Sequence, residues 1–252
     1  MKKLLGLLLI GSALVMTSCE TTREISFNDD GSGTMVTTTD MSGLLAIAKM
    51  SGQGKEMEGD DKAIDTTINL EKMIDSIPDL SAEEKTLAKK GTLGLNLNMA
   101  EEKLVTRLQF PFSNAGDISK LDQLSAKVMQ QTMKKQMGDG GENAPPISSD
   151  EMPKGSMEEY FTTTYKKGLI EKKHIAEKYA DVANDKGMQA MKEMAGQGMP
   201  MNTTLIYNLP RPVKKAEGKN LKLSEDKKKV TILSSVEDFF DDVTKLEFKI
   251  EY

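Results

Sequence analysis

The 252-residue chain is poor in the residues on which many enzymes and ligand-binding proteins depend. It has one cysteine, one histidine and no tryptophan, and 5% of its residues are aromatic. A single cysteine excludes an internal disulfide framework, and a single histidine excludes a multi-histidine metal site and a two-histidine acid–base pair. The few aromatic rings argue against the stacking surfaces that bind single-stranded nucleic acids. A formal net charge of −5 also disfavours nucleic acid as a partner.

The chain begins with a short apolar run. Two lysines precede an apolar stretch over residues 4–16, and Thr17-Ser18 then leads to the single cysteine, Cys19. A charged start, an apolar middle and small residues at a cleavage point are typical of a secretory signal peptide. The run is shorter than the roughly 20 apolar residues of a transmembrane helix. We therefore predict a signal peptide over residues 1–18 that is removed from the mature chain.

Residues 14–19, Leu-Val-Met-Thr-Ser-Cys, resemble the lipobox of bacterial lipoproteins. The usual form has leucine three residues before the cysteine and alanine or glycine directly before it, where this chain has Met16 and Ser18. The resemblance implies that Cys19 is lipidated, with a diacylglycerol and an amide-linked acyl chain, and that residues 19–23 form a lipidated tether. Two or more acyl chains give stable membrane attachment. The alternatives are an ordinary signal peptide that leaves a free thiol, or a buried cysteine.

Three segments after the signal share one pattern: a strand, a turn, a second strand and then a helix. They begin near Arg23, Leu93 and Leu221. In the first segment, residues 29–31 (Asp-Asp-Gly) lie between two β-rich runs, a strong hairpin signal because glycine accepts the positive φ of a tight turn. The same residues resemble a fragment of a calcium loop but lack its other oxygen ligands, so a turn is favoured. The three segments are either an internal repeat or a common supersecondary choice.

Helical periodicity appears twice in the rest of the chain. Apolar residues at steps of three and four predict an amphipathic helix over residues 118–133 and a second one over about 175–194, in which Gly187 is a weak point. Residues 81–84 fit a capping box at the start of a shorter helix. Residues 246–252 alternate between apolar and charged side chains, which is the pattern of a half-buried strand.

Together these elements predict an α+β fold, in which an antiparallel β-sheet built from hairpins carries several amphipathic helices on one face. We predict a single ectodomain over residues 24–252. It contains mobile loops near 51–61 and 138–155, because these stretches are rich in glycine and polar residues. The alternative is two small domains, 24–137 and 156–252.

No catalytic motif stands out in the sequence. His174 lies in a charged stretch without a nucleophile-elbow sequence nearby, and we predict that it faces solvent. Residues 52–55 (Gly-Gln-Gly-Lys) lack the earlier glycine and the following Ser or Thr of a phosphate-binding loop. Carboxylates are numerous, but no pair is marked above the others. We therefore predict no enzyme activity and no catalytic, cofactor-binding or metal-binding residues.

Methionine is abundant, with 18 residues, and Met188, Met191 and Met194 could share one helix face. Thioethers are soft ligands for Cu(I), which makes copper the sharpest metal hypothesis. Methionine also fills irregular cores and adaptable apolar grooves, and no cysteine or histidine lies close by in the sequence to strengthen coordination. Core packing or an apolar groove is therefore favoured over copper.

Three short motifs are similar to those of uncharacterised lipoproteins of Bacteroidota-type bacteria: residues 30–33 (Asp-Gly-Ser-Gly), 110–112 (Phe-Pro-Phe) and 207–210 (Tyr-Asn-Leu-Pro). The resemblance implies attachment to the outer membrane, on the periplasmic or the surface side, and it brings no known activity to carry over to this chain. We predict a lipid-anchored cell-envelope protein with a non-enzymatic structural or interaction role, whose partners are the membrane and another envelope protein. One alternative is a carrier or sensor of an apolar ligand, such as a lipid, in a Met-rich groove. The other is an enzyme that uses paired carboxylates.

Overall fold

The computed structural model describes residues 19–43, 63–75, 77, 80–98, 100–137, 157–196 and 201–252. The predicted signal peptide (1–18) and the predicted loops near 51–61 and 138–155 lie outside the described residues. The fold is α+β, as the sequence predicts, with two β-sheets and several helices. None of the helices in the described part of the chain is long and apolar enough to cross a membrane.

The larger sheet has eight strands, in the spatial order β10 (Leu221–Leu223), β11 (Lys229–Ser235), β8 (Met201–Asn208), β1 (Cys19–Phe27), β2 (Gly33–Asp40), β5 (Lys103–Phe112), β4 (Thr92–Asn98) and β3 (Ala63–Asn69). The smaller sheet has four, in the order β6 (Phe161–Lys166), β7 (Leu169–His174), β12 (Phe248–Glu251) and β9 (Lys215–Gly218). The α-helices are α2 (Glu71–Ile74), α3 (Ala82–Ala88), α4 (Ile118–Met137), α5 (Ala176–Ala180), α6 (Lys186–Gly196) and α7 (Val236–Asp241). Short 3-10 helices are η2 (Ala115–Asp117), η3 (Met157–Tyr160), η4 (Val182–Asn184) and η5 (Val243–Leu246).

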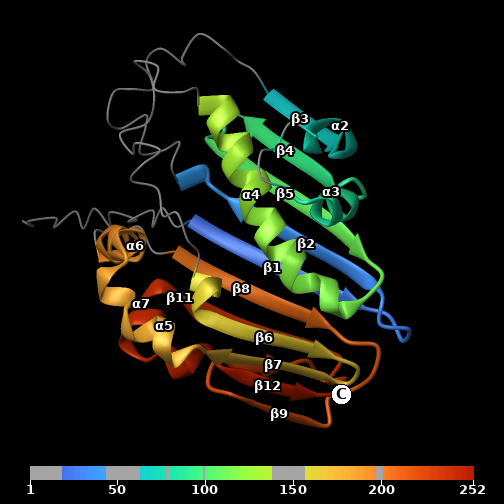
Figure 1. Ribbon diagram of the computed structural model, residues 1–252, viewed down its shortest axis with the longest axis vertical. Coiled ribbons are helices and arrows are strands. Elements are labelled where there is room, and N and C mark those ends of the chain that lie inside the picture. Colours follow the sequence, from blue (N-terminus) through green and yellow to red (C-terminus); the bar gives the residue numbers. More distant parts are fainter. Residues whose placement is uncertain are drawn as a thin grey trace, which may run out of the picture.

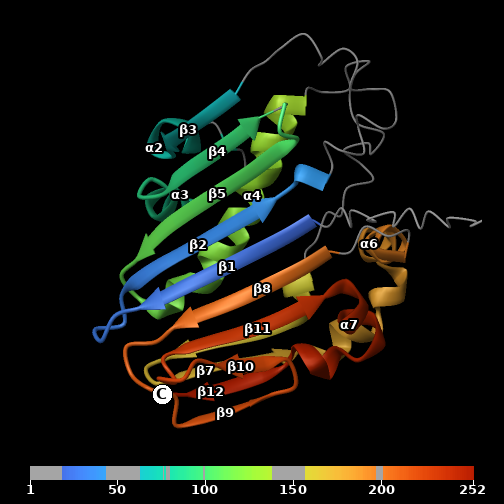
Figure 2. The ribbon, with the colours of Figure 1, turned by 180° about the vertical axis from the view of Figure 1, so that it is seen from behind.

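The large sheet has one covered face and one open face. Figure 1 shows α4 lying across the covered face, with α2 and α3 beside it and the small sheet in front of β8 and β11. Figure 2 shows the opposite face, where no described element lies over β8, β1, β2, β5 and β4. The prediction of helices on one face is confirmed. The small sheet shares that face, so the second layer is part helix and part sheet.

The β1–β2 hairpin forms at the predicted turn. Gly31 has a φ of 87°, the left-handed conformation that glycine adopts without steric cost. The turn is closed by the backbone N–H of Asn28, which donates to the carbonyl oxygen of Ser32 at 2.8 Å. The side chain of Asp30 accepts from the backbone N–H of Ser32 at 2.9 Å. The hairpins predicted from the other two segments, β4–β5 and β10–β11, also form and belong to the same sheet.

One pair of strands departs from the predicted antiparallel pattern. β1 and β8 run parallel, in a register from Cys19 opposite Met201 to Ser26 opposite Asn208. Parallel neighbours cannot be joined by a tight turn, and here most of the chain lies between them. A hairpin signal is local, whereas this pairing joins distant strands, so the sequence pattern did not indicate it. The pair brings strands from both sides of the 138–155 segment into one sheet.

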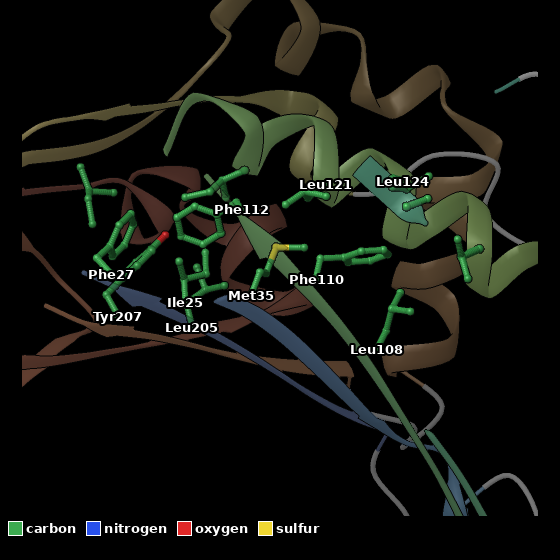
Figure 3. Packing of buried hydrophobic residues seen from close by; sticks show 14 of the residues in the cluster. Ile25, Phe27, Met35, Leu108, Phe110, Phe112, Leu121, Leu124, Leu205 and Tyr207 are labelled. Atoms are coloured by element: carbon green, nitrogen blue, oxygen red, sulfur yellow. The ribbon is translucent and has the colours of Figure 1, made fainter. Parts of the chain in front are cut away.

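The main core lies between the large sheet and α4. Figure 3 shows Ile25, Met35, Phe110 and Leu121 from β1, β2, β5 and α4 directed into this layer. Each of these side chains is at most 1% exposed, and full burial of such a side chain contributes about 1.5–3 kcal/mol. The α4 positions at steps of three and four are completely buried, which confirms the predicted amphipathic helix: Ile118, Leu121, Leu124 and Val128.

The prediction of one long helix over residues 175–194 is wrong, because the chain forms α5, η4 and α6 in this region. Asp181 lies between α5 and η4, and Asp185 lies between η4 and α6. The carboxylate of Asp185 accepts from the backbone N–H of Gly187 at 2.9 Å and of Met188 at 3.1 Å, and so caps the start of α6. The same carboxylate accepts from the hydroxyl of Tyr160 at 2.6 Å, which ties the break to η3.

The shorter helices enclose a second apolar cluster. Phe239 of α7 lies at its centre and is fully buried, and the hydroxyl of Tyr179 donates to the backbone carbonyl of Phe239 at 2.8 Å. Three rings pack edge-on against Phe239, with Phe240 at 5.2 Å, Tyr179 at 5.3 Å and Tyr160 at 5.4 Å between ring centroids. The buried members are Tyr160, Phe161, Met188, Phe239, Val243 and Leu246.

The predicted start of α3 is confirmed, and α7 begins with a similar cap. The hydroxyl of Ser81 accepts from the backbone N–H of Glu84 at 3.2 Å, while the Glu84 carboxylate accepts from the N–H of Ser81 at 2.8 Å, which completes the capping box of α3. Ser235 caps α7 by accepting from the N–H of Asp238 at 3.0 Å. The strand predicted over 246–252 is shorter, because Leu246 belongs to η5 and β12 begins at Phe248.

Candidate functional site

Cys19 is the first residue of β1, a strand with a neighbour on each side. The chain pairs with Met201 of β8 at Cys19, and the next residue, Glu20, pairs with Asp40 of β2. The predicted tether, residues 19–23, is therefore the first half of a central strand rather than a separate linker. The fold does not test lipidation of Cys19, which stays a prediction.

A groove opens at the other end of the sheet. It consists of two adjoining hollows of about 350 and 240 Å³, and we call it the distal groove. Lys167, Gly168, Arg211 and Tyr252 line both hollows. Figure 1 shows the C-terminus on the same side of the molecule as the arrowheads of β1 and β8, opposite the start of β1. Phe27 lines the groove and is eight residue-to-residue steps from Cys19 along β1. At the rise of an extended strand, the groove therefore lies about 27 Å from Cys19.

The walls of the distal groove come from connections that are distant in sequence. The β1–β2 turn and the β6–β7 turn form two of them, and the segment after β8 forms a third. Gly168 allows the β6–β7 turn through its φ of 77°, and its carbonyl accepts from the backbone N–H of Tyr252 at 3.0 Å. Because three elements meet here at loop ends, the groove exists only in the folded chain.

Charged side chains of both signs surround the distal groove. The guanidinium Nε of Arg211 lies 3.8 Å from a carboxylate oxygen of Asp29, and both side chains are exposed. The ammonium of Lys214 donates to the backbone oxygen of Tyr252 at 3.4 Å. Exposed Lys167 projects from the rim. Such a surface offers cationic donors and main-chain polar groups, which suits the binding of a polar or charged surface.

A group of buried and partly buried charges lies apart from the groove lining, and we call Arg23, Asp122, Glu158 and Lys172 the ion cluster. The guanidinium of Arg23 on β1 is 3.1 Å from the carboxylate of Asp122 on α4, and their side chains are 15% and 17% exposed. The ammonium of Lys172 on β7 donates to Glu158 of η3 at 2.8 Å. The cluster therefore joins four elements in the seam between α4 and the small sheet.

Burial and neighbouring charges perturb the ion cluster. Burial raises the pKa of Asp122 to about 6, although Arg23 opposes the rise. Burial would also raise the pKa of Glu158, but Lys172 and Arg23 outweigh it and lower that pKa. Burial would lower the pKa of Arg23, and the attraction of Asp122 and Glu158 raises it instead. Of the two acids in the ion cluster, Asp122 is thus the one that takes up a proton at the higher pH.

The ion cluster is incompletely hydrogen-bonded. Within the described residues, three buried side-chain atoms make no hydrogen bond of suitable geometry: Arg23 Nε, Thr37 Oγ1 and Asp122 Oδ1, the last of which is the oxygen of the ion pair with Arg23. Arg23 and Thr37 are directly paired across β1 and β2, so their side chains share the covered face. Unpaired buried polar groups cost free energy, so this seam is stabilised less than its short contacts alone suggest.

The ion cluster contains two acids, which is the arrangement that an enzyme with paired carboxylates would need. Only the pKa of Asp122 is raised, and Arg23 and Lys172 balance the two negative charges. Neither hollow of the distal groove is lined by Asp122 or Glu158. The geometry therefore suits a role in joining α4 to the small sheet.

His174 is more enclosed than the sequence predicts. Its Nδ1 lies 2.7 Å from a carboxylate oxygen of Glu247, and its backbone N–H donates to the same oxygen at 3.1 Å. The imidazole packs edge-on against Tyr179 with 5.9 Å between ring centroids, and its side chain is 26% exposed. The prediction that it faces solvent is therefore wrong. These contacts attach β7 to the segment before β12.

Two of the three methionines of α6 pack into the core, and Met194 is partly exposed outside the cluster. Met188 is 1% exposed within the second apolar cluster, and Met191 packs against the same cluster from the next turn. These two thioethers face Phe239 and its neighbours, as expected for methionine in an irregular core. Within the described residues, no group of three or more His, Cys, Asp or Glu side chains is arranged to hold a metal ion.

The sequence contains a signal for two members of the ion cluster. Arg23 falls within the predicted tether, yet it is in step with Ile25 and Phe27 at every second residue, so all three lie on one face of β1. Lys172 is likewise in step with buried Ile170 on β7. A charged residue in phase with buried apolar residues indicates a buried charge that needs a counterion.

No protein-family model matches this chain, and no curated protein matches its sequence. Among solved structures, the folded domain of LppM from Mycobacterium tuberculosis, determined by NMR, is similar over 93% of this chain and 90% of its own. The two chains are 7% identical and the TM-score is 0.37. A score of this size does not establish a shared fold.

Proposed function

We propose that this chain is a lipid-anchored protein of a bacterial cell envelope with a non-enzymatic structural or interaction role. The lipobox-like residues before Cys19 support the anchor. The observation that carries the proposal is that β1 starts at Cys19 and is paired on both sides from its first residues. Acyl chains on this residue would hold the centre of the large sheet at the membrane without an intervening linker.

The distal groove supports the interaction role. It lies about 27 Å along β1 from Cys19, so the anchored residue and the groove are at opposite ends of the strand and the anchor leaves the groove free. Its charged, open lining suits the surface of another envelope protein better than a buried apolar ligand. Attachment to the outer membrane is the finer form of the proposal and rests on the resemblance to Bacteroidota-type lipoproteins alone.

The anchor is tested on the full-length chain expressed in a diderm bacterium and labelled with an alkyne fatty acid. We expect Cys19→Ser to abolish labelling, to block processing and to release the protein from the membrane fraction, because the chain has no other cysteine. Ser18→Ala is the matched control, since it brings the preceding position to the usual lipobox residue and should keep all three properties. Unchanged labelling and fractionation of Cys19→Ser would refute the anchor.

The interaction role is tested with a photo-crosslinking amino acid in intact cells. Placed at Lys167, on the rim of the distal groove, it should form a discrete adduct with an envelope protein. The control position is Lys222 on β10, which is also an exposed lysine but lies outside the groove. No adduct at Lys167, or equal adducts at both positions, would contradict a role for the groove.

A further inference from the structure

The outer edge of the large sheet is an exposed strand without the usual protection. β3 has seven residues, all of them exposed, and among the described residues it pairs with β4 alone. It contains no lysine, arginine or proline, and Asp65 is its only charged residue. Ile64 and Ile68 are 37% and 41% exposed. Edge strands normally carry charges, proline or bulges that prevent pairing with another chain.

The other sheet edges differ from β3. β10 has three residues and carries exposed Lys222, and β9 has four residues with exposed Lys215 and Glu217. β6 lies against η2, so its outer edge is not presented in the same way. Short, charged or covered edges are poor templates for pairing. β3 is therefore the edge at which the described fold is most open to another strand.

We propose that β3 is a dimerisation edge, at which two copies of this chain pair antiparallel and extend the large sheet across a two-fold axis at Thr66. This inference rests on the exposed edge and is independent of the anchor at Cys19. With Thr66 opposite Thr66 of the second copy, Ile64 lies opposite Ile68, and Asp65 lies opposite Thr67. Each isoleucine meets an isoleucine, and no like charges face each other.

Other registers pair the same residues less well. A two-fold axis at Asp65 would place the two Asp65 carboxylates opposite each other and each Ile64 opposite Thr66, which combines charge repulsion with a mismatched apolar face. The axis at Thr66 is therefore the register that the sequence of β3 favours. Because β3 runs in the same direction as β1, the two β1 strands of the pair run in opposite directions, which two chains anchored in one bilayer allow when their strands lie along the membrane surface.

The test is disulfide crosslinking of the full-length chain in native membranes. Directly opposed residues of antiparallel strands have Cα atoms about 4.5–5.5 Å apart, which a disulfide can bridge. We expect Thr66→Cys to give a disulfide-linked dimer on mild oxidation. Thr162→Cys, an exposed threonine on the edge strand β6, is the matched control and should stay monomeric. The unmodified chain reports any contribution of Cys19.

Two further variants test the register and the apolar contact. Asp65→Cys mixed with Thr67→Cys should crosslink more than either variant alone. Ile68→Lys in the Thr66→Cys chain should lose the crosslink, whereas Leu233→Lys, at an exposed leucine on β11, should keep it. Circular dichroism verifies that both lysine variants remain folded. The proposal fails if Thr66→Cys and Thr162→Cys crosslink equally, if Ile68→Lys leaves the crosslink unchanged, or if Thr66→Cys is captured only by a different protein.

Discussion

Replacement of Arg23 by methionine tests the ion cluster directly. Arg23→Met keeps a long side chain on the covered face of β1 but removes the charge that lies 3.1 Å from Asp122. Asp122 and Glu158 then keep only Lys172 as a buried counterion. Removing one partner of a buried ion pair costs about 3–5 kcal/mol, because the remaining charge is uncompensated. For a chain of this size, that corresponds to a fall in Tm on the order of 10 °C.

The double variant Arg23→Met/Asp122→Leu separates charge from packing. It removes both charges and fills the seam with apolar side chains, so we expect its free energy of unfolding to return to within about 1 kcal/mol of the wild type. Urea unfolding at pH 7.5, followed by circular dichroism, measures all three proteins. The single variant should also regain stability at pH 5, where Asp122 can take up a proton. The reasoning is refuted if Arg23→Met costs less than about 1 kcal/mol, or if the double variant is no more stable than Arg23→Met.

Two further predictions concern pH and packing. Because the pKa of Asp122 is about 6 in the folded chain and 3.8 as its ordinary value, the folded state binds the proton more tightly. The stability contributed by this group is therefore highest below pH 4 and falls by up to about 3 kcal/mol as pH rises to 6. The urea midpoint of Asp122→Asn should lack this fall, and parallel pH profiles of the two proteins would contradict the assignment. Gly33→Ala should destabilise the chain by about 1–3 kcal/mol, because a Cβ there would overlap the carbonyl oxygen of Ser26 and the ring of Phe112. Gly196→Ala, which has open space around it at the end of α6, is the control, and equal Tm values for the two variants would disprove the overlap.

Local patterns predicted the elements whose causes are local. The turn at Gly31 follows from the freedom of glycine at positive φ, and the capping box at Ser81 follows from hydrogen bonds within one helical turn. The apolar face of α4 follows from helical periodicity, and the burial of Leu121 and Leu124 on that face agrees with it. Periodicity failed over residues 175–194, because the Asp185 cap and its bond to Tyr160 interrupt the helix that the apolar residues suggest.

Only part of the candidate site can be predicted from such local patterns. The lipobox resemblance at Cys19, the α+β composition and the hairpins follow from the amino-acid sequence alone, because each depends on residues that are neighbours in the chain. The remaining features depend on tertiary contacts. The parallel pairing of β1 with β8, the contact of Arg23 with Asp122 and the walls of the distal groove join residues that are far apart in sequence. Such contacts depend on which buried surfaces meet, and no local turn, cap or periodic pattern specifies that choice.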